Sequence, residues 1–257
     1  MRTSGTGNRD GTDQTSPPGD PRGGRPVDGR FVVVREESRA TLIPVDGVEL
    51  PADLSVPGDA TGVVLFAHGS GSSRRSPRNM AVAHVLNRDG LATVLVDLLT
   101  EAEEEIDAGT AELRFDIGLL TRRLVGIVDW LNAQPALRDA RIGIFGASTG
   151  AAGALAAAAA RPGRVAAVVS RGGRPDLAGP ALDQVRAPTL LLVGGRDEQV
   201  RQLNEQALRA LPDNAELRVV PGATHLFEEP GALEEVAHAA STWFAGHLVP
   251  GQLMPGR

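Results

Sequence analysis

The sequence predicts an α/β fold with a mostly parallel central sheet, helices on both faces of that sheet and an antiparallel N-terminal edge. Short apolar runs alternate with amphipathic stretches along the chain, as is typical of buried parallel strands that are joined by helices. Aromatic residues make up only 3% of the sequence, so small aliphatic side chains must fill most of the core. The expected buried strands are residues 63–67, 92–96, 142–145, 165–169, 189–193 and 217–220.

Local signals place the other elements around these strands. Residues 31–34, 41–44 and 48–50 are short β-type runs separated by Gly and Asp turns, and they predict the antiparallel edge. Ser76 followed by Pro77 is typical of a helix start, and Gly90 of its end. An apolar stripe with helical spacing from Leu233 to Phe244 predicts a last helix that packs on the sheet.

Composition also sets the expected domain organisation. Residues 1–29 are rich in Gly, Pro, Asp and Arg and carry few apolar side chains, so we expect a disordered N-terminal tail. One domain is expected over residues 30–249, followed by a C-terminal tail over residues 250–257. The span 171–187 is too short to hold a lid domain, which predicts an open site.

Charge and residue usage exclude several classes of function. The formal net charge of −6 argues against a nucleic-acid partner, which requires a basic face. The sequence has no cysteine, so disulfides, thiolate metal sites and a cysteine nucleophile are excluded. No apolar run has the length of a membrane span or the form of a signal peptide, so we expect a cytoplasmic protein with no membrane partner. No metal-ligand cluster or nucleotide fingerprint is found, so no metal and no cofactor is expected.

The pattern G-x-S-x-G at residues 146–150 is the strongest functional signal. It stands between an apolar strand and a run of small residues typical of a helix, where a sharp turn exposes the serine. The neighbours of such a crowded turn must lack side chains, and Gly146 and Gly150 meet that need. We therefore expect Ser148 to be a nucleophile. The alternative is a glycine-rich connection with an exposed serine of no consequence.

A serine hydroxyl needs a base that is itself held by a carboxylate, in the chain order serine, acid, histidine. Asp197 and His225 each follow a predicted strand, and the carboxyl ends of parallel strands share one edge of a sheet. Asp197 also suits the N-cap of the next helix, and Asp176 is the fallback acid. The rival histidines, His238 and His247, lie on the last predicted helix.

The loop His68-Gly69-Ser70-Gly71-Ser72-Ser73 follows the strand at residues 63–67 and is the expected oxyanion side. We expect the main-chain nitrogens of Ser70 and Thr149 to bind the oxyanion. His68 precedes the serine in the chain, which favours a role in orienting this loop. A phosphate-binding loop is the alternative, but the lysine and the spacing that it requires are missing.

Together, HGSGSS at His68, GASTG at Ser148, GGRD at Asp197 and GATH at His225 resemble the dienelactone hydrolase family, over residues 31–248. The resemblance implies a compact α/β-hydrolase fold without a lid. Dienelactone hydrolases proper use a cysteine nucleophile, whereas this chain has Ser148. Similar chains with a segment like SRGGRPDLAGP, which begins here at Ser170, occur beside phosphoribosyltransferase-like domains. The resemblance therefore names a phosphoribosyltransferase-like protein as a candidate partner.

The expected activity is hydrolysis of a small ester or lactone through an acyl-enzyme on Ser148. The alternatives are an acyltransferase or perhydrolase with the same triad, and a non-catalytic binding protein on this fold. Arginines near the predicted edge suit a substrate carboxylate, and we expect His68, Arg74 and Arg171 to contact the substrate. Solvated or internally paired arginines are the simpler alternative. The acidic run 101–107 is expected to be a solvated loop, with the mouth of the site as its alternative place.

Overall fold

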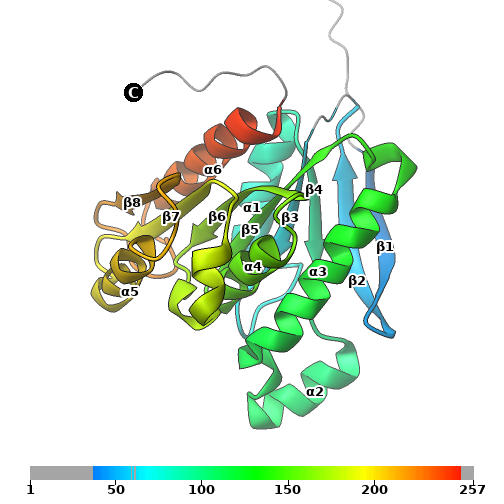
Figure 1. Cartoon of the computed structure of the whole chain (residues 1–257), viewed down its shortest axis with the longest axis horizontal. Coiled ribbons are helices and arrows are strands. Elements are labelled where there is room, and N and C mark those ends of the chain that lie inside the picture. The colour runs from blue at the N-terminus through cyan, green and yellow to red at the C-terminus, as the bar shows by residue number, and fades with distance from the viewer. Residues whose placement is uncertain (1–36, 59, 61, 250–257) are drawn as a thin grey trace, which may run out of the picture. The chain divides into compact units, whose positions relative to one another are not determined.

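The computed structural model describes residues 37–58, 60 and 62–249. They form an eight-stranded sheet in the order β1-β2-β4-β3-β5-β6-β7-β8 (Figure 1). The first two strands pair antiparallel, β2 pairs antiparallel with β4, and all later pairs are parallel. The strands are β1 Glu37–Val45, β2 Val48–Val56, β3 Gly62–Ala67, β4 Ala92–Val96, β5 Arg141–Ala147, β6 Val165–Arg171, β7 Thr189–Gly194 and β8 Ala215–Val220.

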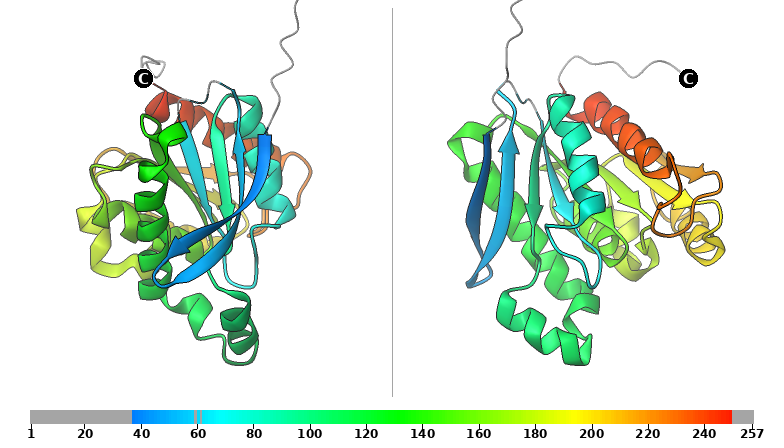
Figure 2. Two further views of the ribbon diagram at one scale, coloured as in Figure 1. Left: turned by 90° about the vertical axis from the view of Figure 1, so that its right-hand side faces the viewer. Right: turned by 180° about the vertical axis from the view of Figure 1, so that it is seen from behind.

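Helices cover both faces of this sheet, because its central strands are apolar on both sides. One core lies under α3, α4 and α5, and the other lies under α1 and α6 (Figure 2). The predicted α/β fold is therefore confirmed. The helices are α1 Pro77–Arg88, α2 Glu101–Thr110, α3 Ile117–Ala133, α4 Thr149–Ala160, α5 Glu198–Leu208 and α6 Ala232–Leu248, with 3₁₀ helices η1 Leu113–Phe115, η2 Pro135–Leu137 and η3 Pro175–Gln184. Within the residues that the structure describes, no helix is both long and apolar enough to cross a membrane.

The residues expected to begin and end the helix α1 have these roles in the structure. The Ser76 hydroxyl caps α1 by accepting a hydrogen bond from Asn79 N–H, and Pro77 occupies the first turn. Gly90 follows the helix with a φ of 86°, a value that suits glycine. The expected tails at residues 1–29 and 250–257 and the expected strand at residues 31–34 lie outside the described residues.

Two details of the sequence prediction are wrong. The acidic run 101–107 belongs to the helix α2, which Thr100 and Glu103 begin with a capping box. In addition, β8 is only partly buried, with Val219 42% exposed, because this strand ends the sheet and has a neighbour on one side only. The predicted strand at 217–220 therefore exists, but it is an edge strand.

Packing of β5 against α6 leads to a first prediction. A Cβ on Gly143 would lie 2.6 Å from Cε1 of Phe244, whose ring is fully buried. Gly143→Ala should therefore lower the free energy of unfolding by about 1–3 kcal/mol through overpacking. Urea unfolding measures this loss.

Gly109→Ala is the matched control, because a Cβ at this position of α2 meets no atom of the described residues within 4 Å. It should leave the free energy of unfolding unchanged or raise it by up to about 1 kcal/mol, since alanine favours a helix more than glycine does. Equal losses in both variants would contradict the tight contact between β5 and α6.

Candidate active site

Ser148 stands at the sharp turn between β5 and α4. Its φ of 49° and ψ of −122° lie in a region that residues with a side chain rarely adopt. A Cβ on Gly146 would lie 2.5 Å from Cα of Ala151, and a Cβ on Gly150 would press against the carbonyl oxygens of Ala67 and His68. Both glycines are therefore required by close backbone approach, as the G-x-S-x-G pattern predicts.

The structure brings Asp197 and His225 together at the same edge of the sheet. Asp197 follows β7 and His225 follows β8, and His225 Nδ1 lies 2.6 Å from Asp197 Oδ2. The carboxylate is mostly buried, whereas the imidazole is 41% exposed. Asp197 precedes α5 but makes no capping hydrogen bond with its side chain, so its carboxylate is directed to His225. The fallback acid, Asp176, is instead paired with Arg174 at 2.7 Å.

The segment Arg171–Arg174 links the nucleophile turn to this pair. Ser148 N–H donates to the Arg171 carbonyl at 3.3 Å, and Arg174 N–H donates to the Ser148 carbonyl at 3.0 Å. Between them, a Cβ on Gly172 would lie 3.5 Å from Cε1 of the His225 ring. Ser148 and His225 therefore contact neighbouring residues of one segment. Within the described part of the chain, no hydrogen bond joins the Ser148 hydroxyl to His225, which is common in enzymes without substrate.

His68 anchors the glycine-rich loop after β3. Leu98 N–H donates to His68 Nε2 at 3.1 Å, so Nε2 is an acceptor and Nδ1 carries the proton, 3.0 Å from the Gly69 carbonyl. Burial lowers the pKa of His68 below its ordinary value of 6.5, against the opposing effects of the Gly69 hydrogen bond and Asp97. His68 is therefore a neutral tether between two loops.

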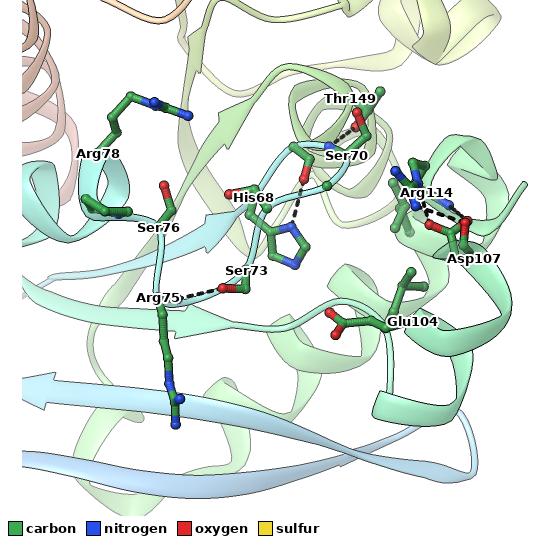
Figure 3. Close-up of a pocket in the computed structure, with 16 residues that line it drawn as sticks. His68, Ser70, Ser73, Arg75, Ser76, Arg78, Glu104, Asp107, Arg114 and Thr149 are labelled. Atoms are coloured by element: carbon green, nitrogen blue, oxygen red, sulfur yellow. Dashed lines mark hydrogen bonds and ion pairs between the residues drawn. The ribbon is translucent and has the colours of Figure 1, made fainter. Parts of the chain in front are cut away.

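The expected oxyanion donors, Ser70 and Thr149, lie side by side. The Ser70 N–H donates to the Thr149 hydroxyl at 3.0 Å, and Thr149 is 2% exposed (Figure 3). Gly69 also lies close to the nucleophile, because a Cβ on Gly69 would be 2.9 Å from Cβ of Ser148. The loop thus reaches the serine, but its Ser70 N–H already has an acceptor.

Arg74 is held inside the protein by carboxylates, and it does not line the cavity that is described below. Its guanidinium pairs with Asp97 and lies 3.2 Å from Asp53, and its N–H donates to Asp97 at 2.6 Å. Because its charge is neutralised by two carboxylates, Arg74 serves to fix the loop. The structure therefore gives no support to the expected substrate contact of Arg74.

Arg171 is also buried, but it has no carboxylate partner like those of Arg74. It is 9% exposed, and its Nε and Nη1 atoms are buried with no hydrogen-bond partner among the described residues. Burial lowers the pKa of Arg171 to about 10, with a further contribution from the positive charge of Arg78. Arg78 in turn lies 3.3 Å from Glu228, just beyond the His225 loop. A buried cation without a partner is costly, so this place favours an anion.

A cavity of about 530 Å³ opens beside the loop from His68 to Ser73 (Figure 3). Thr149 and the loop from His68 to Ser73 form one wall, and Arg75 and Arg78 lie at another. The opposite wall comes from α2, which projects beyond the strand ends, and from residues on either side of it in the chain. Its lining residues are Leu99 before α2, Glu104 and Asp107 on α2, Arg114 on η1 and Leu120 on α3. Burial, with Asp97 as a second cause, raises the pKa of Glu104. The acidic run therefore contributes to the cavity, as the alternative interpretation of that run expects.

Some residues that support the site were not expected from the sequence. Asn204 on α5 is fully buried, and its amide donates to the Gly173 carbonyl at 3.0 Å. Glu229 accepts a hydrogen bond from Thr224 N–H at 3.0 Å next to His225. The Thr224 side chain first, and this N–H second, lower the pKa of the Glu229 carboxyl. Asp97, which pairs with Arg74, was also missed. It directly follows β4, so the rule that places polar site residues at the carboxyl ends of parallel strands could have predicted it.

Comparison with known proteins identifies the family of this chain. The model of the dienelactone hydrolase family matches residues 52–246. The chain belongs to this family. A dienelactone hydrolase structure from Anabaena variabilis is 58% identical, with a TM-score of 0.82, over 83% of this chain and 99% of that one. This family member thus has the α/β-hydrolase fold, and the resemblance seen in the sequence motifs is confirmed.

Other relatives of this family member are more distant or much longer. Est1E from Butyrivibrio proteoclasticus is 18% identical with a TM-score of 0.66, over 79% of this chain and 96% of that one, which supports the fold alone. Proteins from Mycobacterium tuberculosis named putative phosphoribosyl transferase are 55% identical over 78% of this chain. The match covers only 44% of their length, so the chain spans less than half of these curated relatives.

The tether at His68 predicts a pH dependence of stability. In the unfolded chain His68 takes up a proton as the pH falls through about 6.5, whereas burial keeps it neutral in the folded protein to lower pH. The unfolded state then binds more protons, so stability falls as the pH drops below 6.5. His68→Gln removes this contribution and should show a smaller loss of unfolding free energy between pH 7 and pH 5.5 than wild type.

Urea unfolding at each pH measures the difference. His84→Gln, which removes an exposed histidine of α1, is the matched control. The same pH dependence in wild type and His68→Gln would show that His68 is not kept neutral by the fold.

Proposed function

We propose that this chain is a serine hydrolase that cleaves a small ester or lactone through an acyl-enzyme on Ser148. The observation that carries the proposal is the strained turn at Ser148, which is held by Arg171 and Arg174, while Gly172 between them lies against the ring of His225, the partner of Asp197. Strain of this kind persists only where the surrounding structure enforces it, and it is concentrated at active sites. The family supports a hydrolase, and the side chains favour the serine mechanism.

The proposed reaction has two halves. His225 accepts the proton of Ser148 while Oγ attacks the ester carbonyl, and Asp197 orients the imidazole and stabilises its positive charge. The carbonyl oxygen becomes an oxyanion beside Thr149, at the positive end of the α4 helix dipole. His225 then protonates the leaving alcohol. Water, activated by the same imidazole, releases the acid and restores the serine.

Labelling with a fluorophosphonate probe tests the nucleophile directly. Wild type should be labelled and should hydrolyse short p-nitrophenyl esters, whereas Ser148→Ala should lose both activities and remain folded. His225→Ala should slow acylation by roughly 10³-fold or more, because the base is lost while the serine remains.

Ser55→Ala is the matched control for loss of a serine, since Ser55 on β2 pairs with Thr93 near the beginning of β4, away from the strand ends that hold the site. It should be labelled like wild type. Labelling that persists in Ser148→Ala would contradict the assignment of the nucleophile, and a wild type that is neither labelled nor active would favour the binding-protein alternative.

We further propose that the preferred substrate of this site is anionic. Arg171 lies at the end of β6, and its carbonyl bonds to the nucleophile residue. Its buried Nε and Nη1 have no hydrogen-bond partner in the described part of the chain, and Arg78 adds positive charge nearby. A substrate carboxylate would supply the missing acceptors through a charge-assisted hydrogen bond. The buried place of Arg171 thus favours the expectation that it binds substrate over the solvated alternative.

A pair of esters that differ in charge tests this preference. Arg171→Met should lower kcat/KM for the p-nitrophenyl monoester of succinate by about tenfold to hundredfold, which corresponds to a charge-assisted hydrogen bond of about 1.5–3 kcal/mol. The p-nitrophenyl ester of butyrate, which lacks the carboxylate, should change by less than about threefold.

Arg186→Met is the control, because it removes a positive charge just before β7 begins, at the end of the strand opposite to the site. It should leave kcat/KM unchanged for both esters. Equal losses for both esters in Arg171→Met would show that Arg171 supports the fold of the site and does not select the substrate.

A further inference from the structure

The hydroxyl of Thr149 is placed for a chemical role of its own. It accepts a hydrogen bond from Ser70 N–H at 3.0 Å. A threonine hydroxyl also carries one proton to donate, and within the described residues that proton has no acceptor. Thr149 is 2% exposed and yet lines the cavity, next to the nucleophile (Figure 3). The free proton is therefore available to a ligand in that cavity.

We propose that Thr149 is a catalytic residue whose hydroxyl donates a hydrogen bond to the oxyanion, beside its own main-chain N–H. This inference rests on the proposed serine-hydrolase function. When Ser148 Oγ bonds to the carbonyl carbon, the electron pair of the C=O double bond moves to its oxygen, and both groups of Thr149 donate to that oxygen. Ser70 then acts through the hydroxyl, because an O–H group that accepts a hydrogen bond becomes a stronger donor.

The competing arrangement is direct donation by Ser70 N–H after the Thr149 side chain rotates away. That rotation would break a buried hydrogen bond and leave the hydroxyl to find another partner in a nearly closed place. A β-branched side chain in a helix also has few alternative rotamers, and Thr149 is the first residue of α4. The arrangement in the structure needs no movement before the reaction, as an effective oxyanion site requires.

Three substitutions at Thr149 separate the two arrangements. Thr149→Val keeps the shape and removes the hydroxyl, Thr149→Ala removes the whole group, and Thr149→Ser keeps the hydroxyl. For hydrolysis of p-nitrophenyl butyrate, Thr149→Val and Thr149→Ala should lower kcat by about 10²–10³-fold, the effect of losing one oxyanion donor. KM should stay within about threefold, and Thr149→Ser should retain most of the activity.

A boronic acid inhibitor gives a second measurement that a purely structural role would not change. It forms a tetrahedral adduct on the serine and mimics the transition state, so Thr149→Val should weaken its binding by a factor similar to the loss in kcat. Circular dichroism and thermal unfolding establish that each variant is folded. If Thr149→Val does not fold, the comparison of Thr149→Ala with Thr149→Ser tests the same group.

The failure of this inference differs from the failure of the proposed function. Wild type that reacts with a fluorophosphonate, together with a Thr149→Val variant whose kcat equals or exceeds that of wild type, overturns the role of the hydroxyl alone. That result would mean that Ser70 N–H binds the oxyanion directly. Wild type that neither reacts with the probe nor hydrolyses esters overturns the serine mechanism, and the role of Thr149 with it.

Discussion

The short segment Arg171–Arg174 is the constraint on which the rest of the site depends. Its backbone forms hydrogen bonds with both the N–H and the carbonyl of Ser148, and its Gly172 lies against the His225 ring. Its Gly173 carbonyl accepts a hydrogen bond from the buried amide of Asn204. Asn204 belongs to α5, the helix that begins directly after Asp197. The proposed nucleophile, base and acid are thus connected through one stretch of chain, so their relative positions do not depend on three independent loops.

This arrangement also explains how the strained turn at Ser148 persists. A positive φ at a residue with a side chain costs of order 1–3 kcal/mol, and two backbone hydrogen bonds from the Arg171–Arg174 segment oppose that cost. At Gly146 and Gly150 the turn approaches α4 and β3 so closely that a side chain at either position would clash. The turn is therefore packed closely on both sides, and Ser148 is partly exposed at the end of β5.

The positions of the main site residues could be predicted, because residues that follow parallel strands lie at the same edge of the sheet although they are far apart in the sequence. Ser148, Asp197 and His225 each follow a strand, so a list of strands was enough to expect them at one edge. The helix α2 could not be found in this way, because half of its residues are charged and they form no apolar stripe; the capping box of Thr100 and Glu103 marks only its start. It depends on partners distant in the sequence, such as Arg123 for Glu103. The edge position of β8 and the pairing of Arg74 with Asp97 likewise follow from tertiary contacts that no local pattern contains.

The contact between Ser70 and Thr149 meets a requirement of the site before any substrate arrives. An unpaired N–H group near the protein interior costs about 1–3 kcal/mol, and a glycine-rich loop could move to avoid that cost. The Thr149 hydroxyl satisfies the Ser70 N–H, while His68 ties the start of the same loop to Leu98 and Arg74 ties its end to Asp97. The loop is therefore fixed at three points around the place where negative charge would develop in the proposed reaction. Dipoles that are already oriented stabilise that charge without reorganising, so the same contacts that hold the loop also prepare it for the reaction.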